Sequence, residues 1–215
     1  MLQATTKSIT FSEFVKWKPD GVNFELYNGV TKEVQPKGKH EEIIGFLATE
    51  FTVEFRRLNL AYFIPKQALV KVENYQTGYS PDILILNRDN LIHEPLWDKY
   101  STVQTSTSIP LVVEIVSSNW RDDYLTKVRD YEEIGIQEYW IVEGLSGESN
   151  SPACKPRDYL GLGGRRYIGN PKQPTISIYS LIDSEYQITQ FRNQDIVISP
   201  VFSGLNLTAK QIFNY

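Results

Sequence analysis

The sequence of 215 residues predicts an α/β fold, in which helices flank a mixed β-sheet and a β-hairpin stands near the N-terminus. Three observations favour this class. Asn28-Gly29, a strong hairpin signal, joins two strand-like stretches within residues 22–34. An amphipathic helix is predicted from Lys39 to about Asn59. A strand, a helix and a second strand then follow one another between Leu111 and Glu143, which is typical of a sheet covered by helices.

The other elements follow from the same periodicities. Thr10 and Glu13 form a capping box, which begins a short helix. Further strands are expected at 61–64, 67–73, 83–86, 175–181, 186–192 and 196–198. Residues 74–80 are expected to form a turn, residues 96–100 a short helix, residues 122–134 a helix that Gly135 ends, and the chain after Leu207 a last helical turn.

The chain is predicted to be a single domain over residues 1–215. Residues 144–174 hold six Gly and four Pro and an excess of basic side chains, so they are expected to form a long basic loop insertion. No apolar run is long enough to span a membrane, and the N-terminus lacks the apolar core of a signal peptide. With Cys154 as the single cysteine, no internal disulfide can form, and we expect a cytoplasmic protein.

The composition also restricts the chemistry. One cysteine and two histidines exclude a zinc site built on Cys or His, so any metal would have oxygen ligands and would be Mg²⁺, with Mn²⁺ as the alternative. The net charge of −4 is not typical of a nucleic-acid-binding protein, which would carry a basic surface. The acids would have to be used on a metal, or the bases gathered locally, for such a function.

Two acids stand in apolar strands. Glu114 lies inside the run Leu-Val-Val-Glu-Ile-Val, and Asp82 precedes the run Ile-Leu-Ile-Leu. A buried carboxylate needs a cation or a proton, because an unpaired charge in the protein interior costs several kcal/mol. If the two strands are adjacent and antiparallel, both carboxylates, with the carbonyl of Ile115, can bind one divalent cation. Lys127 on the following helix would orient the nucleophile or stabilise the oxyanion in phosphodiester cleavage.

Several motifs carry a resemblance to a known family. They are Pro-Asp before Ile-Leu-Ile-Leu, the strand of Glu114, Asp-x-x-x-Lys ending at Lys127, Glu-Tyr-Trp-Ile-Val, the hairpin Phe-Glu-Leu-Tyr-Asn-Gly-Val, and His40. Over nearly its whole length the chain resembles the Uma-type family of putative restriction endonucleases, within the PD-(D/E)xK nuclease superfamily. The resemblance implies a restriction-endonuclease-like fold, a DNA substrate, and metal-binding roles for Asp82 and Glu114, with Glu25 as an added acid of the pocket.

One position departs from the superfamily pattern. The lysine is expected two residues after Glu114, where this chain has Val116, and the resemblance implies that Lys127 replaces it. The sequence also allows Lys127 to form an ordinary surface pair with Asp123, four residues earlier. Glu114 has the alternative of a structural salt bridge with Lys127, and Asp82 that of capping a turn after Pro81.

The remaining candidates have weaker signals. Glu25 has the alternative of facing solvent on its strand, and His40 that of stabilising the start of its helix. Lys39, His40, Arg165 and Arg166 are predicted to contact the phosphates of the nucleic acid. Tyr131 and Trp140 are predicted to be core residues.

Three functions therefore stay open. The first is a Mg²⁺-dependent DNA endonuclease that acts as a homodimer. The second is a nucleic-acid-binding or regulatory module of the same fold without catalytic activity, which Val116 and the acidic net charge favour. The third is a homo-oligomeric interaction protein with an interface in residues 175–200, which the 13 Tyr and the strands near the C-terminus favour. No protein partner can be identified from the sequence.

Overall fold

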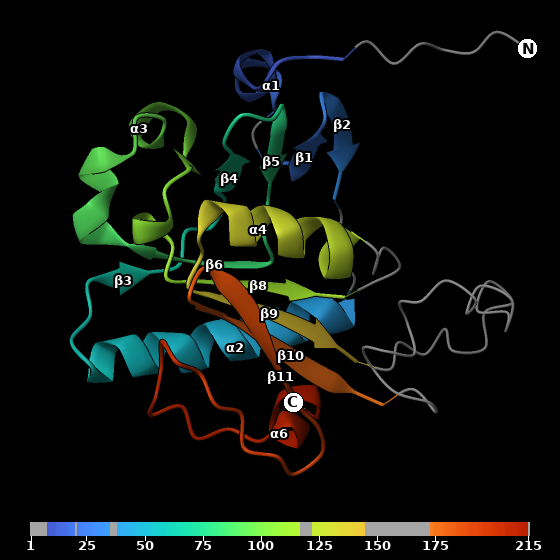
Figure 1. The fold of residues 1–215 in the computed structure, drawn as a ribbon, viewed down its shortest axis with the longest axis vertical. Helices are drawn as coiled ribbons and strands as arrows, with labels where there is room; N and C mark the ends of the chain where they lie inside the picture. Colours follow the sequence, from blue (N-terminus) through green and yellow to red (C-terminus); the bar gives the residue numbers. More distant parts are fainter. Residues whose placement is uncertain (1–7, 20, 35–37, 117–121, 145–172, 215) are drawn as a thin grey trace, which may run out of the picture.

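The computed structural model describes residues 8–19, 21–34, 38–116, 122–144 and 173–214. These residues form an α/β fold with two β-sheets and flanking helices (Figure 1), which confirms the predicted class. No helix among the described residues is both long and apolar enough to cross a membrane. The assignment of residues 1–215 to a single domain stays a prediction. The predicted basic loop at 144–174, apart from its first residue and its last two, lies outside the described residues.

The smaller sheet contains the predicted hairpin. Its order is β2-β1-β5-β4-β7, with β1 at Phe24–Tyr27, β2 at Val30–Glu33, β4 at Leu69–Val72, β5 at Thr77–Tyr79 and β7 at Thr102–Val103. The hairpin is thus not an isolated arm but the edge of a second sheet. The expected turn at 74–80 is wrong in part, because β5 pairs with both β1 and β4. Gly78 permits this close packing, since a Cβ there would lie 2.4 Å from the Phe11 ring.

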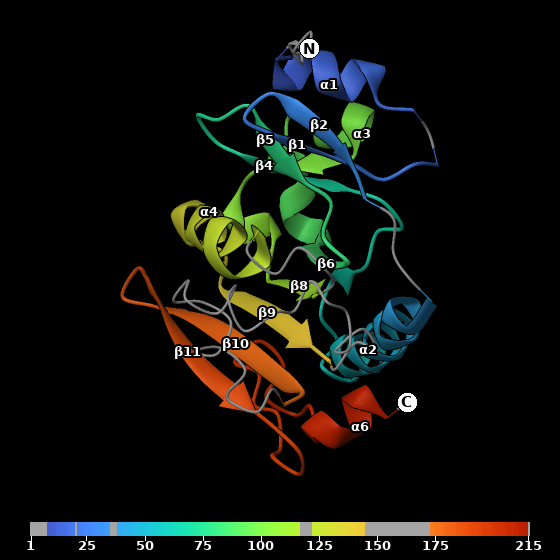
Figure 2. The same cartoon turned by 90° about the vertical axis from the view of Figure 1, so that its right-hand side faces the viewer.

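Helix α1 (Phe11–Trp17) covers this sheet at the end of the molecule farthest from α6 (Figure 2). The predicted capping box is present, because the Thr10 side chain accepts from the Glu13 amide and the Glu13 carboxylate accepts from the Thr10 amide. Phe11 and Phe14 of α1 are buried in one cluster with Leu26 of β1.

The larger sheet has the order β11-β10-β9-β8-β6-β3. Its strands are β3 at Tyr62–Phe63, β6 at Ile83–Asn87, β8 at Leu111–Ile115, β9 at Glu138–Glu143, β10 at Thr175–Ile182 and β11 at Glu185–Phe191. Strands β8 and β9 are parallel, and the other neighbours are antiparallel. The parallel pair is joined through the π-helical turn η3 (Asp122–Lys127) and the helix α4 (Val128–Ile134), as a parallel pair requires a crossover.

Helices cover both faces of this sheet (Figures 1 and 2). The long helix α2 (Gly38–Arg57) packs Leu47 and Phe51 onto one face, against Val113 and Trp140. Helix α4 packs Tyr131 onto the other face. The alternation along β8 therefore decides which core each side chain joins, and Glu114 lies on the α4 face together with Val112.

Short elements connect the two sheets and complete the C-terminal part. They are η1 (Arg88–His93), the predicted short helix α3 (Trp97–Tyr100), η2 (Ser106–Ser108) and α6 (Ala209–Phe213). The predicted strand at 196–198 is wrong. Ile196 forms only an isolated bridge to Thr208, because this stretch runs along the C-terminal segment rather than along a sheet.

Candidate active site

Asp82 and Glu114 lie side by side because their strands are antiparallel neighbours. Ile83 of β6 pairs with Val113 of β8, and one further step of the same register places Asp82 opposite Glu114. The condition under which the two carboxylates can meet, adjacent antiparallel strands, is therefore met. Asp82 also binds the neighbouring strand directly, since its Oδ2 accepts a hydrogen bond from the Ile115 amide at 2.7 Å. Glu114 is only 4% exposed, so its charge needs a partner.

Lys127 supplies that partner. It ends the π-helical turn η3, a wide turn of a kind often found at functional sites, and its side chain is buried. Its Nζ donates to Glu114 Oε1 at 2.8 Å and lies 3.0 Å from Glu25 Oε1 and 3.5 Å from Asp123 Oδ1. The pair with Asp123 is thus real, but it is buried and shared with two other acids. Lys127 reaches the acids although position 116 is Val.

Glu25 joins the same group from the other sheet. It lies on β1, it is buried, and its Oε1 also accepts from the Ser80 amide at 3.3 Å. We call Glu25, Asp82, Glu114 and Asp123 the acid cluster. Asp123 was not among the predicted site residues, and its spacing of four from Lys127 was the signal that pointed to it. The acid cluster draws on two strands, the start of a third and a helical turn, which are distant in the sequence.

Three carboxylates lie within 3.5 Å of the Lys127 ammonium, and Asp82 lies opposite Glu114, so the acid cluster is electrostatically crowded. Burial, together with Asp82 and Asp123, raises the pKa of Glu114 well above its usual range, although Lys127 acts against the shift. Burial likewise raises the pKa of Asp123 to about 6. Burial alone would lower the pKa of Lys127, but Glu114, Glu25 and Asp123 outweigh it and raise that pKa. The acid cluster therefore keeps the Lys127 ammonium protonated, and its excess of acids favours the binding of further positive charge.

His40 approaches the acid cluster from the first turn of α2. Its Nε2 lies 2.7 Å from the carbonyl oxygen of Ile115 and 3.3 Å from Asp82 Oδ2. Because a carbonyl only accepts hydrogen bonds, Nε2 carries a proton and donates to it. Burial lowers the pKa of His40, but Asp82 and the Ile115 carbonyl outweigh it and raise the pKa. The Nδ1 atom is buried without a hydrogen-bond partner among the described residues.

The structure says less about the other residues that are predicted to contact nucleic acid. Lys39 is exposed beside His40 at the start of α2, which leads away from the acid cluster. Arg165 and Arg166 lie outside the described residues, so their predicted role stays a prediction.

The comparisons with known proteins bear on this arrangement. A family model described as Uma2, putative restriction endonuclease, matches residues 11–210. The chain belongs to the Uma2 family. The match covers all of the acid cluster, His40 and Lys127, so the resemblance predicted from the motifs is confirmed.

A solved structure shows the same fold. It is a crystal structure titled a putative nuclease belonging to DUF820 from Anabaena variabilis, and it matches this chain with a TM-score of 0.63 and 17% sequence identity. The match covers 96% of this chain and 98% of that one. The comparison with curated proteins found no match. The fold of this Uma2 protein is therefore that of a structure described as a putative nuclease.

The donor set of the acid cluster fits a hard divalent cation. Carboxylate and carbonyl oxygens are the ligands that Mg²⁺ and Mn²⁺ prefer, and the acid cluster holds four carboxylates, three of them in contact with Lys127. Glu114 Oε2 and Asp82 Oδ1 have no hydrogen-bond donor in the described part of the chain. Within the described segments, however, no three His, Cys, Asp or Glu side chains already converge as a formed metal site. The point of convergence is instead the Lys127 ammonium.

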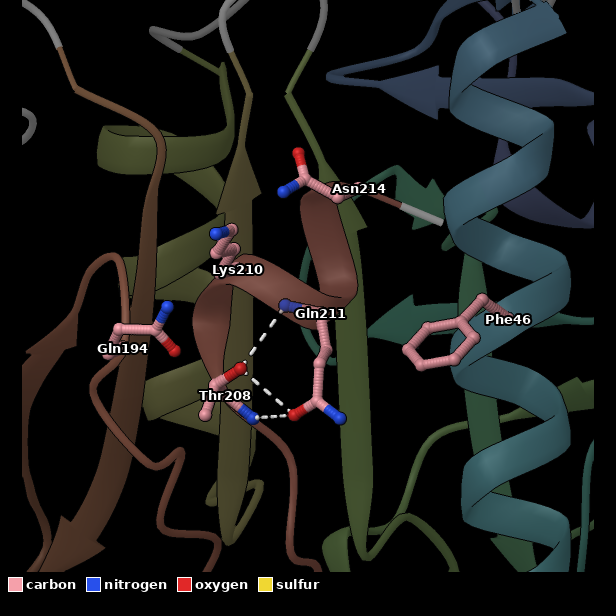
Figure 3. A pocket seen from close by; sticks show the side chains of 6 residues that line it. All are labelled: Phe46, Gln194, Thr208, Lys210, Gln211 and Asn214. Atoms are coloured by element: carbon pink, nitrogen blue, oxygen red, sulfur yellow. Dashed lines mark hydrogen bonds between the residues drawn. The ribbon is translucent and has the colours of Figure 1, made fainter.

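A cavity of about 450 Å³ lies elsewhere, between α2 and α6 (Figure 3). Its lining consists of Phe46, Gln194, Thr208, Lys210, Gln211 and Asn214. Thr208 and Gln211 already satisfy each other as the capping box of α6. Among the described residues, the lining of this cavity has no carboxylate, so it lacks the chemistry of the acid cluster.

Proposed function

We propose that this Uma2 protein is a metal-dependent endonuclease that hydrolyses phosphodiester bonds in DNA. The observation that carries the proposal is the contact of Lys127 Nζ with Glu114 Oε1 at 2.8 Å, beside Asp82 on the neighbouring strand. Two acids and a lysine are the groups that the nuclease superfamily combines. Here Lys127 contacts Glu114, Asp82 lies opposite Glu114 on the neighbouring strand, and the three residues come from three different elements.

Each residue has a proposed role. Asp82 and Glu114 hold the cation, and their oxygens without donors are the ones available to it. A bound Mg²⁺ or Mn²⁺ supplies the positive charge that neutralises the scissile phosphate and acidifies water. Lys127 holds the attacking water or the oxyanion in place through its ammonium, which the surrounding acids keep protonated.

Glu25, Asp123 and His40 support this centre. Glu25 and Asp123 fix Lys127 from two further directions, so that its Nζ cannot rotate away. His40 holds the Ile115 carbonyl through Nε2 and presents the start of α2, with the exposed Lys39, to the phosphates.

The same proposal includes Mg²⁺ as the ion, DNA rather than RNA as the substrate, a homodimer as the active unit and a location in the cytoplasm. They rest on the resemblance and the composition described above. Sedimentation velocity of the purified protein tests the dimer directly, and a species of one chain mass, 24.8 kDa, contradicts it.

The test is cleavage of supercoiled plasmid DNA with Mg²⁺ or Mn²⁺. Wild-type protein is expected to nick the plasmid, and Glu114→Gln, which keeps the shape of the side chain and removes its charge, is expected to lower the rate by about 100-fold or more. Glu133→Gln removes a charge from the exposed side of α4 and serves as the matched control. Cleavage that persists in Glu114→Gln overturns the assignment. DNA binding by wild-type protein without cleavage at any Mg²⁺ or Mn²⁺ concentration assigns the inactive module instead.

A further inference from the structure

Tyr131 belongs to the core, as the sequence predicts, but it also contacts the acid cluster. Its side chain is completely buried on the inner face of α4. Its hydroxyl donates to Glu114 Oε1 at 3.1 Å, the same oxygen that accepts from Lys127. Glu114 thus has two donors on one oxygen and none, among the described residues, on the other.

The position of the Tyr131 ring is fixed by two other tyrosines. Tyr79 of β5 contacts it edge to face at 5.6 Å between ring centroids, and Tyr139 of β9 does so at 4.9 Å. The Tyr79 hydroxyl is bound by Asp130 at 2.5 Å, and the Tyr139 hydroxyl donates to the Asp123 carbonyl at 3.1 Å. Each of the three hydroxyls is therefore bound to a different residue, and a ring held between two others cannot shift easily.

A buried hydroxyl at this position lowers stability unless it makes a hydrogen bond. The ring alone would fill the space, and burial of a hydroxyl without a partner is unfavourable, so Phe would serve packing equally well. The only hydrogen bond that Tyr131 OH makes among the described residues goes to Glu114. The added oxygen therefore acts on the carboxylate rather than on the core.

We propose that Tyr131 is a positioning residue for the cation site: its hydroxyl locks Glu114 Oε1 together with Lys127, so that Oε2 stays turned towards the cation. This inference rests on the proposed function, since it assigns a use to the free oxygen of Glu114. It adds a residue that touches neither the cation nor the DNA and acts only through Glu114. Groups that orient a metal ligand in this way typically affect metal affinity by 10- to 100-fold.

The test is Tyr131→Phe, which removes one oxygen and keeps the ring between Tyr79 and Tyr139. Tyr186→Phe is the matched control, because Tyr186 belongs to the same row of rings, and its hydroxyl donates to the Ile136 carbonyl at 2.9 Å rather than to a residue of the acid cluster. Mn²⁺ binding to the whole protein is measured by titration calorimetry, and near-ultraviolet circular dichroism checks that both variants keep their packing.

Tyr131→Phe is expected to bind Mn²⁺ about 10- to 100-fold more weakly than wild type, while Tyr186→Phe binds it as wild type does. At saturating Mn²⁺ the cleavage rate of Tyr131→Phe is expected to recover to within a few fold, because the metal then holds Glu114 itself. Equal Mn²⁺ affinities of Tyr131→Phe and wild type overturn the inference and leave the proposed function standing. If both variants bind Mn²⁺ equally weakly, the inference is also overturned, because any lost hydroxyl in the row of tyrosines then has the same effect.

A metal-free measurement separates this inference from the proposed function. In a double-mutant cycle, Tyr131→Phe and Glu114→Ala, which removes the acceptor oxygen, are combined and their unfolding free energies compared; the two changes are expected to be non-additive. Additive changes overturn the contact itself. Wild-type protein that binds no Mn²⁺ while the cycle shows coupling overturns the proposed function, and the role of Tyr131 in a cation site falls with it.

Discussion

Two buried glutamates on neighbouring strands show how a candidate site differs from the scaffold. Glu114 lies on β8 and Glu138 on the parallel strand β9, and both are almost fully buried. Glu138 uses both oxygens: Oε1 accepts from Trp140 Nε1 at 2.5 Å and Oε2 from the Val201 amide at 2.8 Å. Among the described residues, Glu114 accepts hydrogen bonds only at Oε1, which Lys127 and Tyr131 share. Burial raises the pKa of both carboxyls.

The difference between the two glutamates shows that burial alone does not identify a functional acid. Glu138 is satisfied by neutral donors and connects β9 to the C-terminal segment at Val201, which is a structural task. Glu114 belongs to a group with more acids than cations and keeps an oxygen without a donor among the described residues. An excess of like charge costs stability, so it is expected where a ligand compensates for it.

The largest effect is expected for Lys127→Met. This change leaves Glu25, Glu114 and Asp123 buried around an apolar side chain, and removal of one partner from a buried charge group costs about 3–5 kcal/mol. Urea unfolding at pH 7 measures the loss, and Mn²⁺ is expected to restore part of it. An unfolding free energy equal to that of wild type would show that the acids are already neutral without Lys127.

Glu138→Ala is expected to lower stability by about 2–4 kcal/mol, because the Trp140 Nε1 and the Val201 amide both lose their acceptor. Mn²⁺ affinity and the cleavage rate per folded molecule are expected to stay at the wild-type values. Glu114→Gln is expected to lower the cleavage rate instead, so the two variants together measure how the two glutamates differ. A loss of Mn²⁺ binding in folded Glu138→Ala would contradict the separation between the two glutamates.

Stability of the metal-free protein is expected to fall as the pH rises from about 4 to 6. Asp123 has a pKa of about 6 in the folded chain against 3.8 for an ordinary aspartate, so the folded state binds more protons in this interval. The contribution is present below pH 4, is lost as the pH rises through 6, and amounts to at most about 3 kcal/mol. Unfolding of wild type and Asp123→Asn at a series of pH values measures it.

Asp123→Asn is expected to lack this part of the pH dependence, and saturating Mn²⁺ is expected to flatten it in wild type. The raised pKa of His40 affects stability in a separate pH interval. Its stabilising contribution is complete below pH 6.5 and is lost as the pH rises beyond that value. A wild-type curve that rises between pH 4 and 6, with Asp123→Asn unchanged, would contradict the crowding of the acids.

The smallest effect is expected for Lys32→Ala. Lys32 pairs with Asp122 at 2.9 Å, one residue before Asp123, but both side chains are about half exposed. An exposed pair of this kind contributes about 0–1 kcal/mol. Thermal unfolding at low and high salt measures it, with Lys127→Met as the buried counterpart. A loss as large as that of Lys127→Met would mean that the position of η3 depends on its surface contact.

Much of the fold is determined by local sequence patterns. The capping box at Thr10, the Asn28-Gly29 turn and the apolar face of residues 39–59 each depend on residues within a few positions, and each element forms as predicted within two or three residues. From the sequence, Asp82 and Glu114 could meet only on the condition that their strands are adjacent and antiparallel, and the structure meets that condition.

The partners of the buried acids and of Lys127 were decided by the tertiary structure alone. The sequence shows Glu114 and Glu138 in equally apolar strands, and it shows Lys127 four residues after Asp123 in what reads as an ordinary helix. Only the packing of β1 against the π-helical turn brings Glu25 to Lys127 and turns a surface pair into a buried cluster. The physical reason is that a side chain's partners depend on contacts between distant segments, whereas sequence periodicity reports only which face of an element is apolar.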